Sequence, residues 1–118
     1  MRLWILCFCF AIATVLSGQT PAAQPSAPAG NAQNGKKLFA SVGCYQCHGF
    51  EGQGGVGPRL APRPIAFAAF SKYLRQPTGE MPPYTAKGVS DKDLADLYNF
   101  LLSIPEPPPP ESIPLLSK

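Results

Sequence analysis

The sequence predicts an all-α fold. Three segments carry helical signals, and no segment shows the alternation of apolar and polar residues that is typical of a half-buried strand. Between these segments the chain is rich in Gly and Pro, which favour turns and irregular loops. The chain has 118 residues, enough for one small domain. Because a domain of this size buries little apolar surface, we expect a staple, a metal or a large cofactor to stabilise it.

The first two predicted helices end near Gly and Pro. We expect the first over 32–41, where Gly43 follows, and the second over 64–75, where Pro77 stops it. Pro64 suits the first turn of the second helix. One face of that helix is expected to carry its apolar residues, Phe67, Phe70, Tyr73 and Leu74.

The third predicted helix follows Ser90. Ser is a favoured N-cap, and Asp91 and Asp93 lie where the positive end of a helix dipole stabilises acidic side chains. An apolar stripe then recurs at helical spacing, formed by Leu94, Leu97, Tyr98, Leu101 and Leu102. These signals predict a helix with one buried face.

Residues 1–23 have the pattern of a secretory signal. One positive charge precedes about fourteen apolar or near-apolar residues, and small residues follow. The apolar run is shorter than the ~20 residues that span a bilayer, although an uncleaved membrane anchor is the alternative. Because Cys7 and Cys9 lie in this segment, only Cys44 and Cys47 are expected in the mature protein.

Two proline-rich segments flank the part of the chain that is expected to fold. Residues 24–33 are uncharged and rich in Pro and Ala, which predicts a flexible linker. Residues 105–118 begin with PEPPPPESIP, where prolines cannot continue a helix. We expect a passive tail there, with a partner-binding strip as the alternative. The folded domain is therefore predicted over 34–104.

The charge pattern narrows the class of partner. The formal net charge is +3, and no basic run with interleaved aromatic residues is present. A nucleic-acid-binding function is therefore not expected. A weak positive balance instead suits docking to an acidic protein, with ordinary solvated lysines as the alternative.

The motif CYQCH at 44–48 is the attachment signature of a c-type haem. Two thiols three residues apart project to the same side of a helical turn, so Cys44 and Cys47 can add to the two vinyl groups of one porphyrin. His48 then lies under the iron and supplies the proximal nitrogen. The alternatives are a zinc site, which needs four ligands, a redox dithiol, which favours a strand-rich fold, and a structural disulfide.

Met81 is the predicted second axial ligand. His48 is the only histidine, and Met81 is the only methionine outside the signal segment. The two prolines after Met81 stiffen its loop, so the thioether can be held against the iron with little loss of entropy. A methionine that fills a gap in the core is the alternative. A Met/His pair raises the reduction potential relative to two histidines.

Pro58 is a candidate partner of the axial histidine. It has a carbonyl oxygen that could accept a hydrogen bond from the outer ring nitrogen of His48 and fix the orientation of the imidazole. A plain turn at Gly57-Pro58 is the alternative.

In this order, the motifs resemble the class I cytochrome c family over about residues 31–105. Residues 34–39 are similar to the N-terminal helix of that family, where a Gly and an aromatic residue contact the last helix. Gly35 and Phe39 match those two positions, and Leu97 and Phe100 match their usual partners.

The resemblance implies a cytochrome c fold, with three to four short helices around one covalently bound haem c. It also implies that Pro58 accepts a hydrogen bond from the axial His48 and that Met81 is the distal iron ligand. Segments 73–84 and 93–101 are similar to bacterial cytochromes that accept electrons from periplasmic dehydrogenases. The short span between His48 and Met81 implies a trimmed loop and an exposed haem edge.

We therefore expect a periplasmic monohaem cytochrome c that carries single electrons between redox partners and is not an enzyme. The expected partners are a dehydrogenase, an oxidase or a reductase, and membrane contact is expected only with an uncleaved anchor. The chain would be a monomer or a subunit of a complex. The alternatives are an electron-accepting subunit of a dehydrogenase, a haem sensor or enzyme with an open distal site, and a purely structural module. Expected walls of the haem cavity are Phe39, Phe67, Phe70, Tyr73 and Tyr84.

Overall fold

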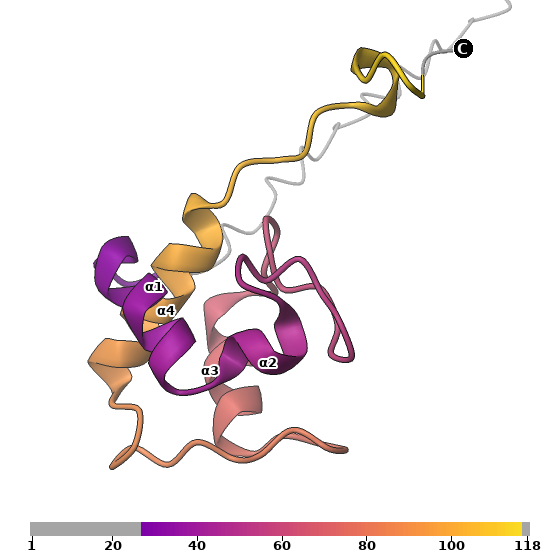
Figure 1. Cartoon of the computed structure of the whole chain (residues 1–118). Coiled ribbons are helices and arrows are strands. Elements are labelled where there is room, and N and C mark those ends of the chain that lie inside the picture. Colours follow the sequence, from indigo (N-terminus) through magenta and orange to yellow (C-terminus); the bar gives the residue numbers. More distant parts are fainter. Residues whose placement is uncertain (1–26, 117–118) are drawn as a thin grey trace, which may run out of the picture.

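The computed structural model describes residues 27–116 (Figure 1). The predicted signal segment, with Cys7 and Cys9, lies outside these residues. Within 27–116 the regular elements are α1 (Ala32–Ser41), α2 (Cys44–His48), α3 (Phe67–Arg75), α4 (Asp91–Ser103) and the short 3-10 helix η1 (Pro110–Ser112). This part of the chain contains no strand, so the prediction of an all-α fold is confirmed.

The centre of the fold is the contact between α1 and α4, which pack against each other (Figure 1). Gly35 permits the close approach, because a Cβ atom there would collide with the backbone oxygen of Asp96 and lie 2.9 Å from Cβ of Phe100. One turn later Phe39 packs on Phe100, with ring centroids 5.4 Å apart and both side chains 3% exposed. Leu97 is also buried. The contacts of Gly35 and Phe39 with Phe100 are those that the family resemblance implied.

The third predicted helix is α4, and it begins where the sequence indicated. Ser90 and Asp93 form a capping box: the Ser90 Oγ accepts from the Asp93 backbone N–H at 3.1 Å, and the Asp93 carboxylate accepts from the Ser90 backbone N–H at 2.9 Å. The predicted stripe is buried except at its end, where Leu102 is 48% exposed. The prediction for Leu102 is wrong because Leu102 lies about 100° around the helix axis from the buried Leu101, which turns it away from the core.

The second predicted helix is shorter than expected. It begins at Phe67 and not at Pro64, because Ala66 has an extended backbone conformation and acts as the N-cap. Phe70 and Leu74 are buried in the core, but Tyr73 is 39% exposed. Tyr73 lies about 100° around the helix axis from Leu74, which turns it away from the buried face.

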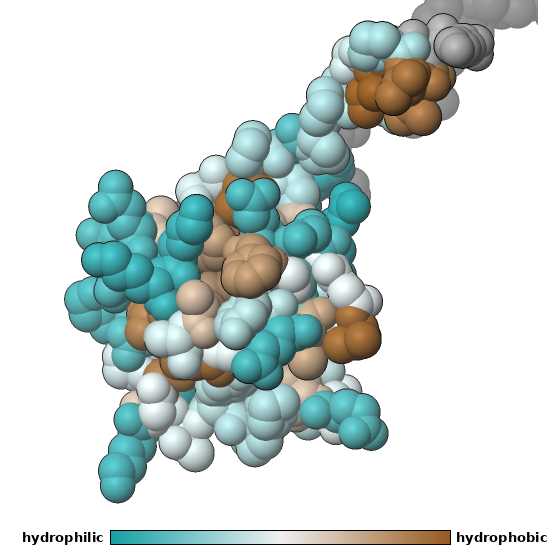
Figure 2. Space-filling view, in the orientation of Figure 1, coloured by the Kyte–Doolittle hydropathy of each residue, from teal (hydrophilic) through white to brown (hydrophobic). Residues whose placement is uncertain are grey.

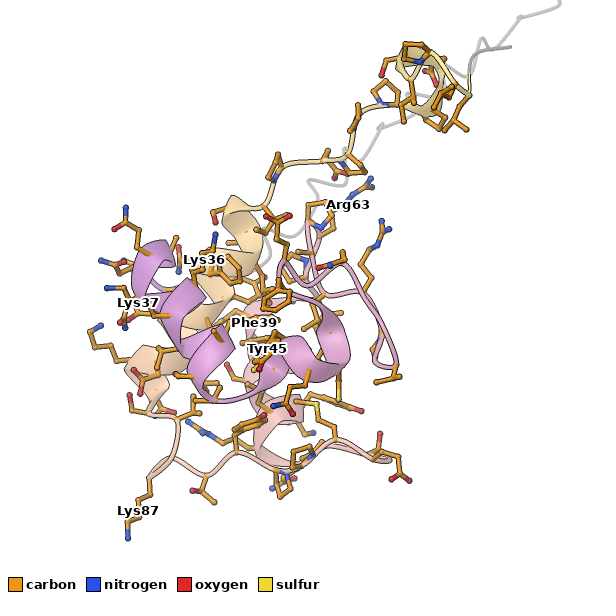
Figure 3. All side chains as sticks on the ribbon, viewed as in Figure 1. Lys36, Lys37, Phe39, Tyr45, Arg63 and Lys87 are labelled. Atoms are coloured by element: carbon orange, nitrogen blue, oxygen red, sulfur yellow. The ribbon has the colours of Figure 1, made fainter. Side chains whose placement is uncertain are left out.

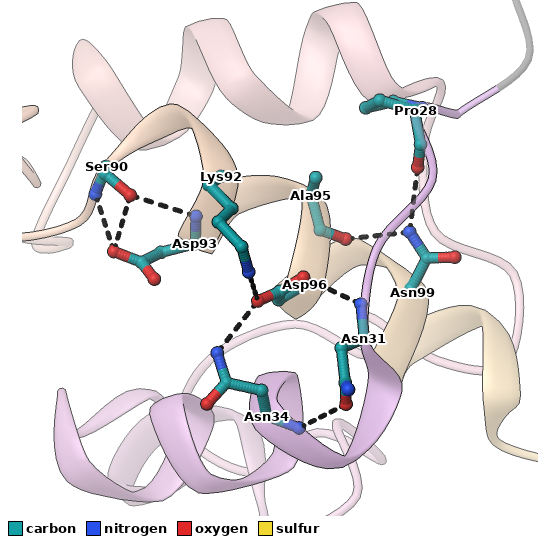
Figure 4. Close-up of polar contacts among 9 residues, drawn as sticks. All are labelled: Pro28, Asn31, Asn34, Ser90, Lys92, Asp93, Ala95, Asp96 and Asn99. Atoms are coloured by element: carbon teal, nitrogen blue, oxygen red, sulfur yellow. Dashed lines mark hydrogen bonds and ion pairs between the residues drawn. The ribbon is translucent and has the colours of Figure 1, made fainter.

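The segment before α1 lies against α4 and does not extend freely into solvent. The Asn31 backbone N–H donates to the Asp96 carboxylate at 2.7 Å, and the Asn99 amide donates to the Pro28 carbonyl at 3.0 Å (Figure 4). Residues 27–33 of the predicted linker therefore contact the helices, and the predicted boundary at residue 34 falls inside α1. The polar groups responsible are far apart in sequence, so no local pattern indicates them.

After α4 the chain leaves the helices as a proline-rich tail (Figure 1). An exposed ion pair between Arg63 and Glu106, with an N–O distance of 2.6 Å, joins the base of the tail to the loop before α3. Figure 2 shows that the far end of the tail is apolar, and Leu115 and Leu116 there are 82% and 63% exposed.

Candidate functional site

The motif CYQCH forms α2, a helix of five residues that follows α1 after Val42 and Gly43. Cys44 and Cys47 stand three residues apart on this helix, which places their side chains on one face. Both are free thiols, with Cys44 half-buried and Cys47 exposed. The structural disulfide that the sequence left open is therefore not formed here.

His48 ends α2 and is buried, with 7% of its surface exposed. Its Nδ1 atom lies 2.8 Å from the carbonyl oxygen of Pro58. Because a carbonyl oxygen only accepts, Nδ1 carries the proton, and Nε2 keeps its lone pair for another partner. The contact between His48 and Pro58 that the sequence anticipated is thus present.

The loop after α2 folds back tightly on His48. The Gly57 backbone N–H donates to the Cys47 carbonyl at 2.9 Å, and the Gly54 backbone N–H donates to the His48 carbonyl at 2.8 Å. A Cβ atom at Gly57 would lie only 2.9 Å from the imidazole Nδ1 and Cε1 atoms. No larger residue fits at Gly57 without a shift of the ring or of the Pro58 carbonyl.

Met81 lies in the loop between α3 and α4 and packs, partly buried, against the hydrophobic core. Tyr84, in the same loop, makes hydrogen bonds to α3 and to the residue that caps the end of α1. Its backbone N–H donates to the Leu74 carbonyl at 2.9 Å, and its hydroxyl donates to the Val42 carbonyl at 3.1 Å. The Met81 loop is therefore held close to the turn that leads into α2.

Tyr84 also lies near the attachment motif, because the Cys44 thiol is one of the groups that raise its pKa. Burial, together with the Cys44 thiol, raises the pKa of Tyr84 to about 12. Burial likewise raises the pKa of the Cys44 thiol. Both groups therefore stay protonated at neutral pH, and the Tyr84 hydroxyl remains a hydrogen-bond donor.

The aromatic side chains fall into three groups. Phe67 and Phe70 cluster with Tyr98 at centroid distances of 5.2 and 5.3 Å, next to the core. Phe39 belongs to the contact between α1 and α4. A third group, which the sequence did not indicate, is the stack of Tyr45 on the exposed Phe50 at 4.8 Å. Tyr73, the other expected cavity wall on α3, is 39% exposed.

A family model described as "Cytochrome C oxidase, cbb3-type, subunit III" matches residues 30–101, which include α1 to α4 almost entirely. The chain belongs to this family of c-type cytochromes. The match begins at Gly30 and ends at Leu101, so the proline-rich tail lies outside the family region of this cytochrome.

Two curated proteins are similar to this cytochrome. The 4-cresol dehydrogenase [hydroxylating] cytochrome c subunit of Pseudomonas putida is 34% identical over 74 residues, which cover 63% of each chain. The menaquinol:cytochrome c reductase cytochrome c subunit of Bacillus subtilis (strain 168) is 37% identical over 68 residues, which cover 57% of this chain but 26% of that protein. The chain thus spans less than two thirds of either relative. No solved structure matches significantly.

Family membership means that this cytochrome carries a covalently bound haem c with its iron. The residues of the site fit such a group. The two thiols of α2 are unpaired, the His48 Nε2 atom is available as an iron ligand, and partly buried apolar side chains pack against the hydrophobic core. These partly buried side chains are Leu60, Phe67, Met81 and Tyr84.

Among residues 27–116, neither a cluster of metal-ligating side chains nor a helix able to span a membrane is present. Residues 27–116 contain no group of three or more His, Cys, Asp or Glu side chains that could hold a metal ion. No helix in the same range is long and apolar enough to cross a membrane. Figure 3 shows that Lys36 and Lys37 project from α1, whereas Arg63 and Lys87 project from separate loops, so the labelled basic side chains form no single patch.

Sequence reasoning missed the contacts of two residues that support the site. The bond from Tyr84 to Val42 spans 42 positions along the chain, and Arg75 reaches groups 9 to 16 positions away. Neither residue belongs to a local motif with a known partner. Only the three-dimensional structure reveals these contacts.

Proposed function

We propose that the chain carries single electrons through a haem c that is bound by Cys44 and Cys47 and ligated by His48 and Met81. The observation that carries this proposal is the hydrogen bond from His48 Nδ1 to the Pro58 carbonyl at 2.8 Å. This bond fixes the imidazole as the tautomer whose Nε2 atom can ligate iron, and it orients the ring. The bound haem would supply the one-electron couple of its iron.

The Met81 loop supports the second half of the proposal. Met81 is partly buried, and Tyr84 holds the loop beside α2. Pro82 and Pro83 restrict the backbone directly after Met81, which lowers the entropy lost when the thioether binds. If His48 and Met81 both ligate the iron, they would leave no position for a substrate, which favours electron transfer over catalysis.

The relatives support a role in a larger redox assembly. Both are cytochrome c subunits, one of a dehydrogenase and one of a reductase. We propose that this chain likewise accepts electrons from a dehydrogenase or reductase subunit and passes them on. We also propose that it works in the bacterial periplasm, where a secretory signal at 1–23 would deliver it. Co-purification of the tagged chain with such an enzyme from its native host tests the assignment, and recovery of the cytochrome alone would contradict it.

The Met81→Ala variant tests the ligand assignment. In the ferric wild-type protein we expect the weak sulfur-to-iron charge-transfer band of a Met/His site, and we expect Met81→Ala to abolish it. The reduction potential should also fall, since a thioether ligand raises it. The matched control is Val56→Ala, because Val56 is 91% exposed and should leave band and potential unchanged. A high-spin wild-type spectrum that readily binds added ligands would support an open distal site instead.

Haem content tests the attachment. The denatured wild-type chain should keep its haem through an acid-acetone wash, since thioether bonds resist this treatment. A Cys44→Ala, Cys47→Ala double variant should release it. A wild-type chain that releases all of its haem would overturn the attachment to the motif.

A further inference from the structure

Arg75, the last residue of α3, makes more polar contacts than any other side chain near the Met81 loop in the described residues. Its Nη1 atom donates to the Tyr84 carbonyl at 2.9 Å and to the Val89 carbonyl at 2.7 Å. Its Nη2 atom pairs with the Asp91 carboxylate at 2.7 Å. The Arg75 side chain is 23% exposed, whereas that of Asp91 is 91% exposed. The two carbonyl contacts are therefore the better shielded ones.

These contacts hold the segment that follows Met81, residues 84–89, against the helices. Tyr84 and Val89 are the two points where it meets the helices, since the Tyr84 backbone N–H also donates to the Leu74 carbonyl and Val89 is 1% exposed. Between them the Val89 backbone N–H donates to the Thr85 carbonyl at 2.9 Å. One guanidinium thus fixes both ends of residues 84–89.

A second contact holds the loop on the other side of Met81. The Tyr73 hydroxyl donates to the Thr78 carbonyl at 3.0 Å, from the helical turn that carries Arg75. Residues 79–83 therefore span the distance between two points fixed to the C-terminal end of α3. Met81 lies in the middle of this short span, so its position depends on both.

We propose that Arg75 is the positioning residue that keeps the Met81 loop closed and so limits replacement of Met81 by an external ligand. This inference rests on the proposed role of Met81 as an axial ligand. Hydrogen bonds from a charged donor to shielded carbonyls are stronger than neutral ones, and loss of Arg75 leaves two carbonyls without this partner. Because the apparent affinity of a competing ligand scales with the open fraction of the loop, loss of Arg75 increases that affinity.

The test is a titration of the ferric holoprotein with imidazole, followed by loss of the sulfur-to-iron charge-transfer band. Arg75→Ala should raise the apparent imidazole affinity by about tenfold or more. Arg75→Lys keeps the charge but not the planar fork, so it should give a smaller increase. The matched control is Lys72→Ala, one turn earlier on α3, where the side chain is exposed and the affinity should stay within about twofold.

A second control separates positioning from general loss of stability. Asn99→Ala removes the bonds from Asn99 to Pro28 and Ala95, neither of which belongs to the Met81 loop, and should lower the unfolding midpoint without raising the imidazole affinity. The inference is overturned if Arg75→Ala and Arg75→Lys both bind imidazole like the wild type, or if Asn99→Ala raises the affinity equally at equal loss of stability. Should Arg75→Ala not fold, Arg75→Lys gives the decisive comparison.

If Met81 is not an iron ligand, the absorption spectra show a different result. If the wild type lacks the charge-transfer band and Met81→Ala leaves its spectrum unchanged, Met81 is not a ligand, and both proposals fall. If the wild type shows the band and only the Arg75 variants fail to respond, the proposed function stands and the role of Arg75 does not.

Discussion

The imidazole of His48 is held by two consecutive residues of the chain. Its Nδ1 donates to the Pro58 carbonyl, and the backbone at Gly57 approaches the same edge of the ring so closely that a Cβ atom would lie 2.9 Å from it. Because the imidazole is oriented before a metal binds, it loses little rotational freedom when Nε2 becomes a ligand.

Gly57→Ala should therefore disturb the histidine. The added methyl group has to displace either the ring or the Pro58 carbonyl, and we expect the free energy of unfolding of the holoprotein to fall by about 1–3 kcal/mol. Denaturant unfolding measures the loss. Gly88→Ala is the control, because a Cβ atom there meets its nearest neighbour at 3.8 Å and should change stability by about 0.5 kcal/mol or less. Equal effects of the two variants would contradict the tight contact at Gly57.

Much of the site could be predicted at this scale. CYQCH is a motif with a chemical reason for each fixed position, and His48 and Met81 are single candidates for their roles in the expected mature chain. The contact with Pro58 was also anticipated. Arg75 and Tyr84 were not assigned their contacts, because their partners are backbone carbonyls, which every residue has, and no sequence pattern marks one carbonyl as a partner.

Among the elements, α1, α4 and the segment before α1 meet at one buried carboxylate. Asp96 is 1% exposed and accepts hydrogen bonds from the Asn31 backbone N–H, the Asn34 amide and the Lys92 ammonium, at 2.7 to 2.8 Å (Figure 4). The backbone bond from Asn31, followed by the bonds from Lys92 and Asn34, lowers the pKa of Asp96 from 3.8 to about 2. The ionised form is thus favoured by folding.

The sign of the pH dependence follows from this shift. Because the pKa of Asp96 is lower in the folded chain, its contribution to stability is present above about pH 4 and is lost as the pH falls toward 2. Asp96→Asn cannot titrate, so the variant should be clearly less stable than the wild type at neutral pH and approach it at acidic pH. Urea unfolding over this pH range measures the difference. Glu111→Gln, on the exposed tail, should show no such convergence. A stability difference that stays constant with pH would contradict the role of the carboxylate.

Element boundaries were predictable where a capping residue marks them. Ser90 and Asp93 placed the start of α4, and the first helix was placed over its full length. Pro64 indicated the wrong start for α3, because a proline permits a first helical turn but does not require one. The extended conformation of Ala66 settles that boundary, and it depends on how the preceding loop packs.

At the scale of the whole molecule, the hydrophobic core of the described residues is small and lies mainly along α4. Its buried apolar side chains are Phe39, Ala61, Phe70, Leu74, Val89, Leu94, Ala95, Leu97, Tyr98, Phe100 and Leu101. A core of this size gives marginal stability alone, so covalent attachment of a large apolar group should add substantially to it.

Removal of the attachment sites should therefore unfold the protein. We expect the Cys44→Ala, Cys47→Ala double variant, purified without haem, to lose most of its helical circular dichroism and its cooperative thermal transition. The haem-loaded wild type is the reference. A cooperative transition in the haem-free variant would contradict the idea that the attached group completes the core.

By itself the sequence determined the fold class, the attachment motif, the candidate iron ligands and the resemblance to class I cytochromes c. These features rest on local spacing, on residue types with few alternatives, or on helical periodicity. Only the tertiary structure decided how the site is supported. It shows that the Arg75 guanidinium binds the Tyr84 and Val89 carbonyls and that the segment before α1 contacts Asp96 of α4. It also decided that Tyr73 and Leu102 are exposed. The physical reason is that such contacts join groups distant in sequence, and the polar ones use donors and acceptors that occur throughout the chain.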